Sequence, residues 1–199
     1  SATAQLLQCT EEPVERALDK LVERGAVVQE PVANVEACYL RRLWEAETSA
    51  AARLNALLAA APDESRQARR AVEEIQRQQG ITYAPRQREA VELAGRVGVL
   101  ILTGGPGTGK TTTVRGIVAL FQKMGLDIVL AAPTGRAAKR MSELTGMEAQ
   151  TVHRLLGMTW NERTHQVTFQ KTEKEPLEAD AVIVDEMSMV DVSLFSALL

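Results

Sequence analysis

Residues Val97 to Thr111 read VGVLILTGGPGTGKT, and this stretch decides the fold. Its first part, Val97–Thr103, is an uninterrupted apolar run, which predicts a strand buried on both faces of a parallel sheet. Its second part, Gly104–Thr111, fits the spacing GxxxxGK followed by Ser or Thr. A glycine-rich loop between a buried strand and a helix predicts an α/β domain that holds phosphate groups at that loop.

Each residue type in this P-loop has a chemical reason. Glycines let the backbone close around an anion, so that several N–H groups and the positive end of the next helix face it. Lys110 is expected to bridge the β- and γ-phosphates of ATP, and the Thr111 hydroxyl to bind Mg²⁺. The predicted phosphate contacts are Gly105, Pro106, Gly107, Thr108, Gly109, Lys110, Thr111 and Thr112.

A second apolar run ends in two carboxylates. Residues Ala181 to Val184 read AVIV and are followed by Asp185 and Glu186. Open α/β sheets bind ligands at the carboxyl ends of their strands, so both carboxylates should face the nucleotide. We expect Asp185 to hold the Mg²⁺ shell and Glu186 to orient and deprotonate the attacking water.

A glutamine precedes the P-loop in the chain. Gln87 lies near the start of a predicted helix, and a glutamine amide can pair with the N6 and N7 atoms of adenine. Taken alone it would be an ordinary surface glutamine. Its position before the P-loop favours a contact with the adenine of ATP.

Basic residues gather in two segments between the P-loop and Asp185. The first, Ala132–Met141, reads APTGRAAKRM, and on a helix Arg136, Lys139 and Arg140 share one face while Ala137 and Met141 share another. A solvated charged face is the alternative to a phosphate-binding one. The second segment, Thr151–Gly157, reads TVHRLLG, and its histidine could equally be packed among the leucines. A strand is predicted over 127–132, before the first segment, and a hairpin over 159–169, turned at 161–164, after the second.

Bulk composition excludes several classes of protein. With 199 residues, 45% hydrophobic and 25% charged, the chain suits a globular α/β domain with a small accessory module. Neither a membrane-spanning run nor a signal peptide is found, which predicts a cytoplasmic protein. The net charge of -3 means that any nucleic acid must be held by local basic clusters. Cys9 and Cys38 predict buried thiols rather than a disulfide or a zinc site.

The first 80 residues have a different pattern. Thr10–Gly25 predicts a helix capped by Thr10, and two short strands, 26–30 and 35–40, predict a hairpin, as in the second half of a winged helix. The exposed positions of the helix carry five acids and three bases, which favours a structural or partner-docking module over a duplex reader. Too few residues precede Thr10 to predict a first helix. Residues 41–80 predict a helical connector, and 81–199 an α/β domain with a parallel sheet.

The motifs together resemble a known set. Gln87, GGPGTGKTT (Gly104–Thr112), APTGRAAKRM, TVHRLLG and VIVDEMSMVD (Val182–Asp191) are similar to motifs Q, I, Ia, Ib and II of the RecD-like helicases of superfamily 1. The TVHRLLG and DEMSMVD stretches are specific to that family. The match covers Ile81–Leu199 well and the N-terminal part loosely, and the extension resembles the stand-alone RecD-like enzymes more than the exonuclease V α subunit.

This resemblance implies a RecA-like, ATP-binding motor domain over 81–199 and, for the family, a 5′ to 3′ DNA translocase driven by ATP. The family's DNA-contacting positions fall here on Thr134, Arg136, Lys139, His153 and Arg154. The partners implied are single-stranded DNA and duplex junctions, with a possible protein partner for the N-terminal module. Because the sequence stops at Leu199, before motif III and the second motor domain, we expect this chain alone to hydrolyse ATP feebly if at all.

Two other functions are compatible with the motifs. The chain could come from a different P-loop ATPase, such as a relaxase-linked or RNA-directed enzyme, or it could be a binding module that keeps a vestigial P-loop. The intact set of Lys110, Thr111, Asp185 and Glu186 argues against the vestigial module.

Overall fold

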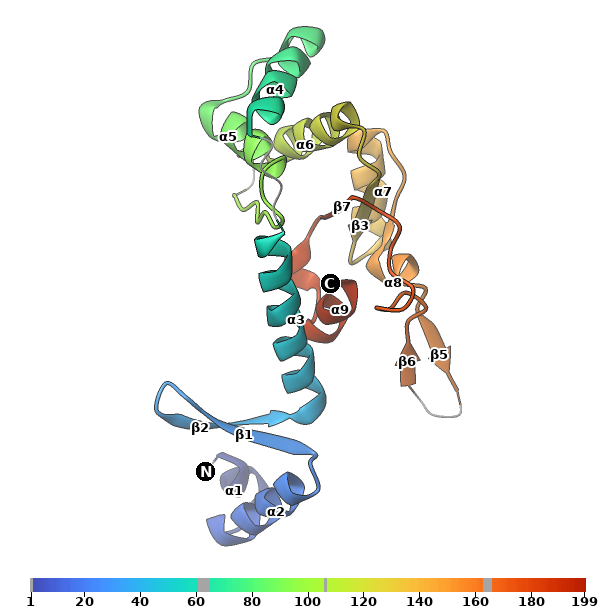
Figure 1. The fold of residues 1–199 in the computed structure, drawn as a ribbon. Coiled ribbons are helices and arrows are strands. Elements are labelled where there is room, and N and C mark those ends of the chain that lie inside the picture. Colours follow the sequence, from blue (N-terminus) through green and yellow to red (C-terminus); the bar gives the residue numbers. More distant parts are fainter. Residues whose placement is uncertain (1, 61–64, 106, 163–165) are drawn as a thin grey trace.

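The computed structural model describes residues 2–60, 65–105, 107–162 and 166–199. Its helices and strands follow an elongated path in Figure 1, from a small module at the N-terminus, along the helix α3, to a sheet with its covering helices. No described helix is long and apolar enough to span a membrane.

The central sheet contains three parallel strands in the order β4-β3-β7. Leu130 at its centre is aligned with Ile183 on one side and Ala149 on the other. The prediction of strands after Asp127 and after Asp180 is confirmed. The strands are β3 (Ile128–Ala132), β4 (Ala149–Thr151) and β7 (Ala181–Val184).

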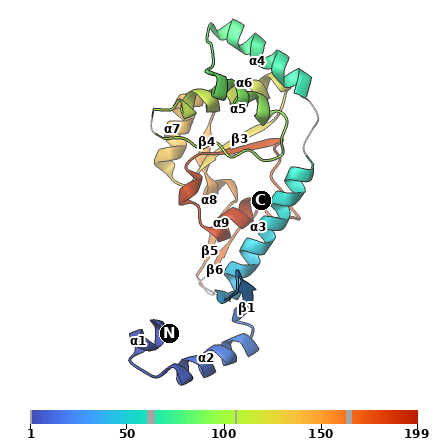
Figure 2. The same cartoon turned by 90° about the vertical axis from the view of Figure 1, so that its left-hand side faces the viewer.

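Helices cover both faces of this sheet, as the α/β pattern predicts. Because successive side chains of a strand point to opposite faces, Leu130 packs with α6 and α7 while Ala131 packs with α8 and α9. Figure 2 shows the strands edge-on between these helices. The helices are α6 (Lys110–Met124), α7 (Gly135–Thr145), α8 (Val152–Leu155) and α9 (Val192–Leu198).

A separate core joins α6 to the helices before the P-loop. Val72, Val91 and Leu120 are fully buried where α4, α5 and α6 meet. The helical structure predicted for 41–80 is confirmed over the described residues by α3 and α4. The bounds are α3 (Arg41–Ala59), α4 (Ser65–Gln79) and α5 (Pro85–Ala94).

The apolar run Val97–Thr103 is not a strand. It pairs with no strand in the described residues, and Ile101 is 82% exposed. Val182 of β7 is also 40% exposed, so that strand is not buried on both faces. An apolar run indicates that its side chains favour burial. A β-strand also needs backbone hydrogen bonds to a neighbouring strand, and the sequence of the run does not specify that neighbour.

The N-terminal module contains two helices and a hairpin. α1 precedes Thr10, so the expectation that no first helix is present was wrong: one and a half turns need only six residues. Thr10 precedes α2 but makes no side-chain cap hydrogen bond. The bounds are α1 (Ala2–Leu7), α2 (Glu11–Glu23), β1 (Val27–Val32) and β2 (Val35–Leu40).

The prediction of buried thiols was also wrong. Cys9 and Cys38 are both exposed free thiols. Both belong to the N-terminal module, and among its described residues, 2–40, only Ala4 and Val27 are buried. A module with so little interior has no site in which to bury a thiol.

A second hairpin lies between the basic segments and Asp185. It confirms the strand pattern predicted over 159–169. Asn161, expected to begin the turn, is instead the last residue of the first strand, and 163–164 of the expected turn lie outside the described residues. The strands are β5 (Thr159–Asn161) and β6 (Gln166–Thr168), and a 3-10 turn, η1 (Met187–Met189), follows Glu186.

Candidate nucleotide and DNA site

The P-loop leads directly into helix α6. Gly109 precedes the helix with φ 84, in the left-handed region that favours glycine. A Cβ at Gly109 would overlap the side-chain amide nitrogen of Gln87. The Lys110 ammonium donates to the carbonyl oxygens of Gly104 and, at 3.2 Å, of Gly105. The lysine therefore bends back over the loop that would hold the phosphates.

Hydroxyl groups brace this loop from within. Thr108 Oγ1 donates to the carbonyl oxygen of Gly105 at 2.9 Å, and Thr113 Oγ1 donates to that of Gly109 at 3.2 Å. Thr113 is buried, whereas Thr111 is half-buried and Thr112 exposed in the first turn of α6. Pro106, a predicted phosphate contact, lies outside the described residues.

Gln87 lies beside the P-loop, as its proposed role requires. Its Oε1 accepts a hydrogen bond from the backbone N–H of Ala84 at 3.0 Å, and its amide nitrogen faces Gly109. The carbonyl of the amide is thus engaged locally at the start of α5. A two-point contact with adenine, which stays a prediction, would require this local bond to be exchanged or shared.

The carboxylates follow β7 in a constrained turn. Asp185 donates its backbone N–H to Ala131 at 3.0 Å, which extends the parallel ladder, and its Oδ1 accepts from the backbone N–H of Glu186 at 2.9 Å. Glu186 has φ 53 and ψ 38. A non-glycine residue in this region costs about 1–2 kcal/mol, and such strain gathers at functional sites.

The donor set at this site suits Mg²⁺. A threonine hydroxyl and an aspartate carboxylate are hard oxygen ligands, and Mg²⁺ in such sites is usually held by one or two protein groups together with phosphates and water. Thr111 and Asp185 are the predicted sources of these two oxygens. No group of three or more His, Cys, Asp or Glu residues in the described part of the chain could form an all-protein cage.

The basic segment after β3 forms the expected two-faced helix. In α7, Arg136, Lys139 and Arg140 are exposed while Ala137 and Met141 are buried. Thr134 caps the helix, and its Oγ1 accepts from the backbone N–H of Ala137 at 3.2 Å. The Thr134 hydroxyl hydrogen remains available to a phosphate oxygen.

The second polar segment is built in the same way after β4. Thr151 caps the short helix α8 and accepts from the backbone N–H of Arg154 at 3.2 Å. Val152 and Leu155 are buried, His153 is half-buried and Arg154 is exposed. The side chains predicted to contact DNA are therefore accessible to a ligand.

Strand register brings these segments to one edge of the sheet. Ala132 is aligned with Thr151, and Ala131 with Val184, so three parallel strands end together. The residues that follow them are Thr134, His153 and Asp185. This is the edge at which open α/β sheets bind ligands.

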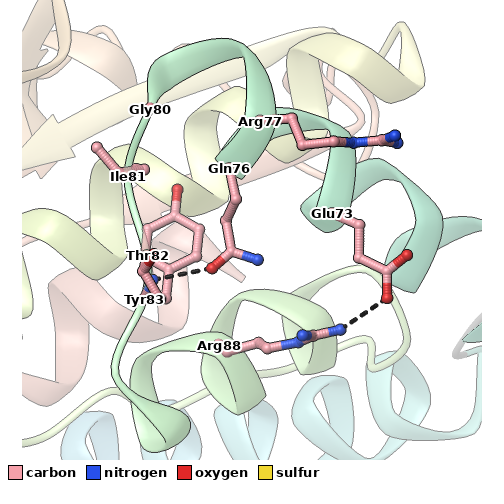
Figure 3. Close-up of a pocket in the computed structure, with 8 residues that line it drawn as sticks. All are labelled: Glu73, Gln76, Arg77, Gly80, Ile81, Thr82, Tyr83 and Arg88. Carbon is pink, nitrogen blue, oxygen red and sulfur yellow. Dashed lines mark hydrogen bonds and ion pairs between the residues drawn. The ribbon is translucent and has the colours of Figure 1, made fainter.

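A hollow of about 690 Å³ lies elsewhere, between α4 and the start of α5 (Figure 3). Within it Gln76 accepts from the backbone N–H of Tyr83 at 2.9 Å, and Arg88 donates to Glu73 at 3.0 Å. The described residues that line it include no P-loop residue. It is therefore distinct from the phosphate site.

Comparison with known proteins identifies the family. A family model described as an AAA domain matches residues 87–199. The chain is 45% identical over 108 residues to the ATP-dependent RecD2 DNA helicase of Deinococcus radiodurans, covering 54% of the chain and 14% of that protein. It is 35% identical over 184 residues to the RecBCD enzyme subunit RecD of Mycolicibacterium smegmatis, covering 81% of the chain and 31% of the relative.

The chain belongs to the RecD-like helicases of superfamily 1. It is also 41% identical over 100 residues to the ATP-dependent DNA helicase dda of phage T4, covering 49% of the chain and 23% of that protein. The chain thus spans less than a third of the length of each of these relatives. An ATP-binding P-loop domain of the RecD family is shown over the part that they share.

One supporting residue of this RecD-like domain was missed in the sequence. Tyr83 is 5% exposed, and a Cβ at Gly116 would lie 2.8 Å from its hydroxyl oxygen. Burial raises the pKa of Tyr83, and the charge of Arg115 opposes that rise. The tyrosine holds the segment that carries Gln87 against α6. An aromatic residue four positions before Gln87 was the available signal, but its partner on α6 depends on tertiary packing.

Proposed function

We propose that this chain is the ATP-binding motor domain of a 5′ to 3′ DNA translocase of the RecD-like family. The observation that carries the proposal is the shared edge of the sheet. The three strands that precede Asp185, Thr134 and His153 end there side by side. A domain that binds nucleotide and a DNA strand at neighbouring segments can link nucleotide binding to DNA binding. Single-stranded DNA is the proposed track.

In this proposal the chain's own residues divide the chemistry between them. Lys110 exchanges the P-loop carbonyls for phosphate oxygens, and Thr111 and Asp185 would hold Mg²⁺, which when bound would neutralise charge on the phosphates. Glu186 orients a water molecule and accepts its proton. Gln87 recognises the adenine.

Movement along DNA requires more than this domain. A translocase steps because nucleotide binding and release change the fit between two motor domains that grip the strand in alternation. Arginine fingers can raise hydrolysis by roughly 10³ to 10⁵. We therefore propose that this chain alone binds Mg-ATP and that stepping belongs to the whole protein.

Nucleotide titration of this chain tests the site. Wild type should bind a fluorescent ATP analogue with Mg²⁺, and Lys110→Ala should weaken binding by at least about tenfold, since the lysine provides a main charge on the phosphates. Lys123→Ala, at the far end of the same helix, is the matched control and should bind as wild type does. Equal affinities of wild type and Lys110→Ala would remove the proposed site.

Hydrolysis is tested in the full-length protein. Glu186→Gln keeps the size of the side chain but loses the base, so ATP binding should persist while single-turnover hydrolysis falls by roughly 10² or more. A rate within a few-fold of wild type would contradict the role of Glu186. Stimulation by single-stranded DNA but not by RNA would favour the DNA motor over an RNA-directed ATPase.

A further inference from the structure

Helix α3 contacts both chain segments that carry the nucleotide site. Near its end, the backbone at Leu57 approaches Gly98 so closely that a Cβ at Gly98 would overlap the Leu57 carbonyl oxygen. Gly98 belongs to the segment that leads into the P-loop. On another side α3 packs against α9, which follows Glu186, and Figure 1 shows the two helices side by side.

Arg53 makes the polar link between α3 and α9. Its Nη1 donates to the carbonyl oxygen of Ser196 at 3.1 Å, and its Nη2 forms an ion pair with Glu173. Ser196 lies in the last turn of α9, where carbonyl groups lack helical partners and a cation is stabilising. The Arg53 side chain is 31% exposed, so part of its link is shielded from water.

The position of α9 bears directly on Glu186. Only η1 and Val190 separate Glu186 from Asp191, whose carboxylate caps α9 by accepting from the backbone N–H groups of Ser193 and Leu194, both at 2.9 Å. Glu186 itself has a left-handed backbone. Such a conformation persists only where its surroundings hold it, and α9 is the first α-helix after it.

At its other end α3 is tied to the N-terminal module. The backbone N–H of Arg41 donates to Ala26 at 3.0 Å, and the Arg41 side chain donates to the carbonyl of Gly25. Trp44 Nε1 donates to Glu30 of β1 at 3.1 Å. A helix of 19 residues is roughly 28 Å long. α3 is therefore one continuous helix that connects the N-terminal module to the segments that carry the nucleotide site.

We propose that Arg53 is a positioning residue for ATP hydrolysis, which anchors α9 to α3 and thereby fixes the placement of Glu186. The proposal rests on the function proposed above. In this arrangement a change in the position of the N-terminal module would shift α3, and with it the Glu186 carboxylate. A misplacement of about 1 Å in a catalytic group can reduce a rate by about 10².

The test compares variants of Arg53 in the full-length protein. Arg53→Met keeps the aliphatic stem but loses both donors, and should lower kcat for ATP at least about tenfold while the affinity for nucleotide changes by less than about twofold. Arg53→Lys, which retains a donor and the charge, should recover part of kcat. Arg42→Ala, an exposed arginine on the same helix, is the matched control and should leave kcat unchanged.

A second variant separates the two contacts of Arg53. Glu173→Ala removes the ion pair and leaves the bond to Ser196, so its kcat should stay within about threefold of wild type. An unchanged kcat in Arg53→Met would overturn the proposal. Parallel losses of kcat, nucleotide affinity and thermal stability would also overturn it, because they would show that Arg53 stabilises the whole fold and has no specific effect on Glu186.

Glu186→Gln serves as the reference in the same assays. If Glu186→Gln hydrolyses ATP normally, the proposed function fails, and the role of Arg53 fails with it. If Glu186→Gln is inactive and Arg53→Met is not, only the Arg53 proposal is overturned.

Discussion

Gly109 and Glu186 both have left-handed backbones, and the physical reasons differ. At Gly109 the absence of a side chain makes the conformation inexpensive and leaves space for the Gln87 amide. At Glu186 the conformation costs free energy, yet a carboxylate is needed there for the chemistry that we propose. Glycine at position 109 therefore fits the shape of the loop, whereas the strain at Glu186 accompanies the reactive role that we propose for its carboxylate.

The space at Gly109 leads to the first prediction. Gly109→Ala adds backbone strain and displaces Gln87, so it should lower the free energy of unfolding by about 1–2 kcal/mol and weaken nucleotide binding at least about tenfold. Gly125→Ala is the control, since Gly125 has φ 75 at the other end of α6 with nothing within 4 Å of an added Cβ. It should cost similar stability in urea unfolding and leave binding intact. Normal binding by Gly109→Ala would contradict the crowding at this loop.

A second prediction concerns Arg136. If its exposed guanidinium grips a phosphate, Arg136→Ala in the full-length protein should weaken binding of single-stranded DNA and reduce the slope of log affinity against log salt by about 0.7. The buried face of α7, with Ala137 and Met141, is untouched by the change. Fluorescence titration of a labelled oligonucleotide across a range of salt measures both quantities. An unchanged slope with unchanged affinity would make α7 a solvated charged face.

Among the helices and strands, features that depend on local sequence were predicted better than features that depend on pairing with a distant segment. The run Val97–Thr103 has the composition of a central strand, but it pairs with no strand among the described residues, while β3 and β7 form as expected. Helix α7 follows its sequence more closely, because hydrogen bonds within a helix are local and its two faces follow from a fixed period.

This contrast gives a third prediction. Ile101→Thr should change the free energy of unfolding by no more than about 0.5 kcal/mol, because Ile101 is 82% exposed. Leu130→Ala, at a buried position in β3, should cost about 2–5 kcal/mol. Urea unfolding of this chain measures both. A loss of more than about 2 kcal/mol in Ile101→Thr would restore the interpretation of this run as a buried strand.

For the molecule as a whole, burial is uneven along the chain. Residues 2–40 contain two buried side chains, Ala4 and Val27, whereas α6 alone contains five buried residues. The ends of α3 therefore join a lightly packed module to a densely packed domain. Local stability follows the number of buried apolar contacts.

Hydrogen exchange tests this difference as the fourth prediction. Amides of α1, α2, β1 and β2 should exchange through local opening well before those of β3 and the middle of α6. Mass spectrometry of peptides from this chain resolves the two regions. Equal protection of residues 2–40 and of α6 would indicate that the module is stabilised by packing that the structure does not contain.

The sequence by itself determined the features that depend on local chemistry. The P-loop, the helix α6 that follows it and ends at Gly125, the two-faced helix α7 and the strands β3 and β7 could all be predicted, as could the chain's family. Each depends on residues that are neighbours in the chain or on a motif of fixed spacing. The roles of Gln87, Glu186 and the DNA-facing residues stay predictions.

Only the tertiary structure decided which segments meet. It left Val97–Thr103 without a partner strand among the described residues, exposed both thiols, packed Tyr83 over Gly116 and joined Arg53 to the end of α9. These are contacts between residues distant in the chain. The free energy of such a contact depends on the shape and burial of both residues. The sequence around one residue does not specify which distant residue it will meet.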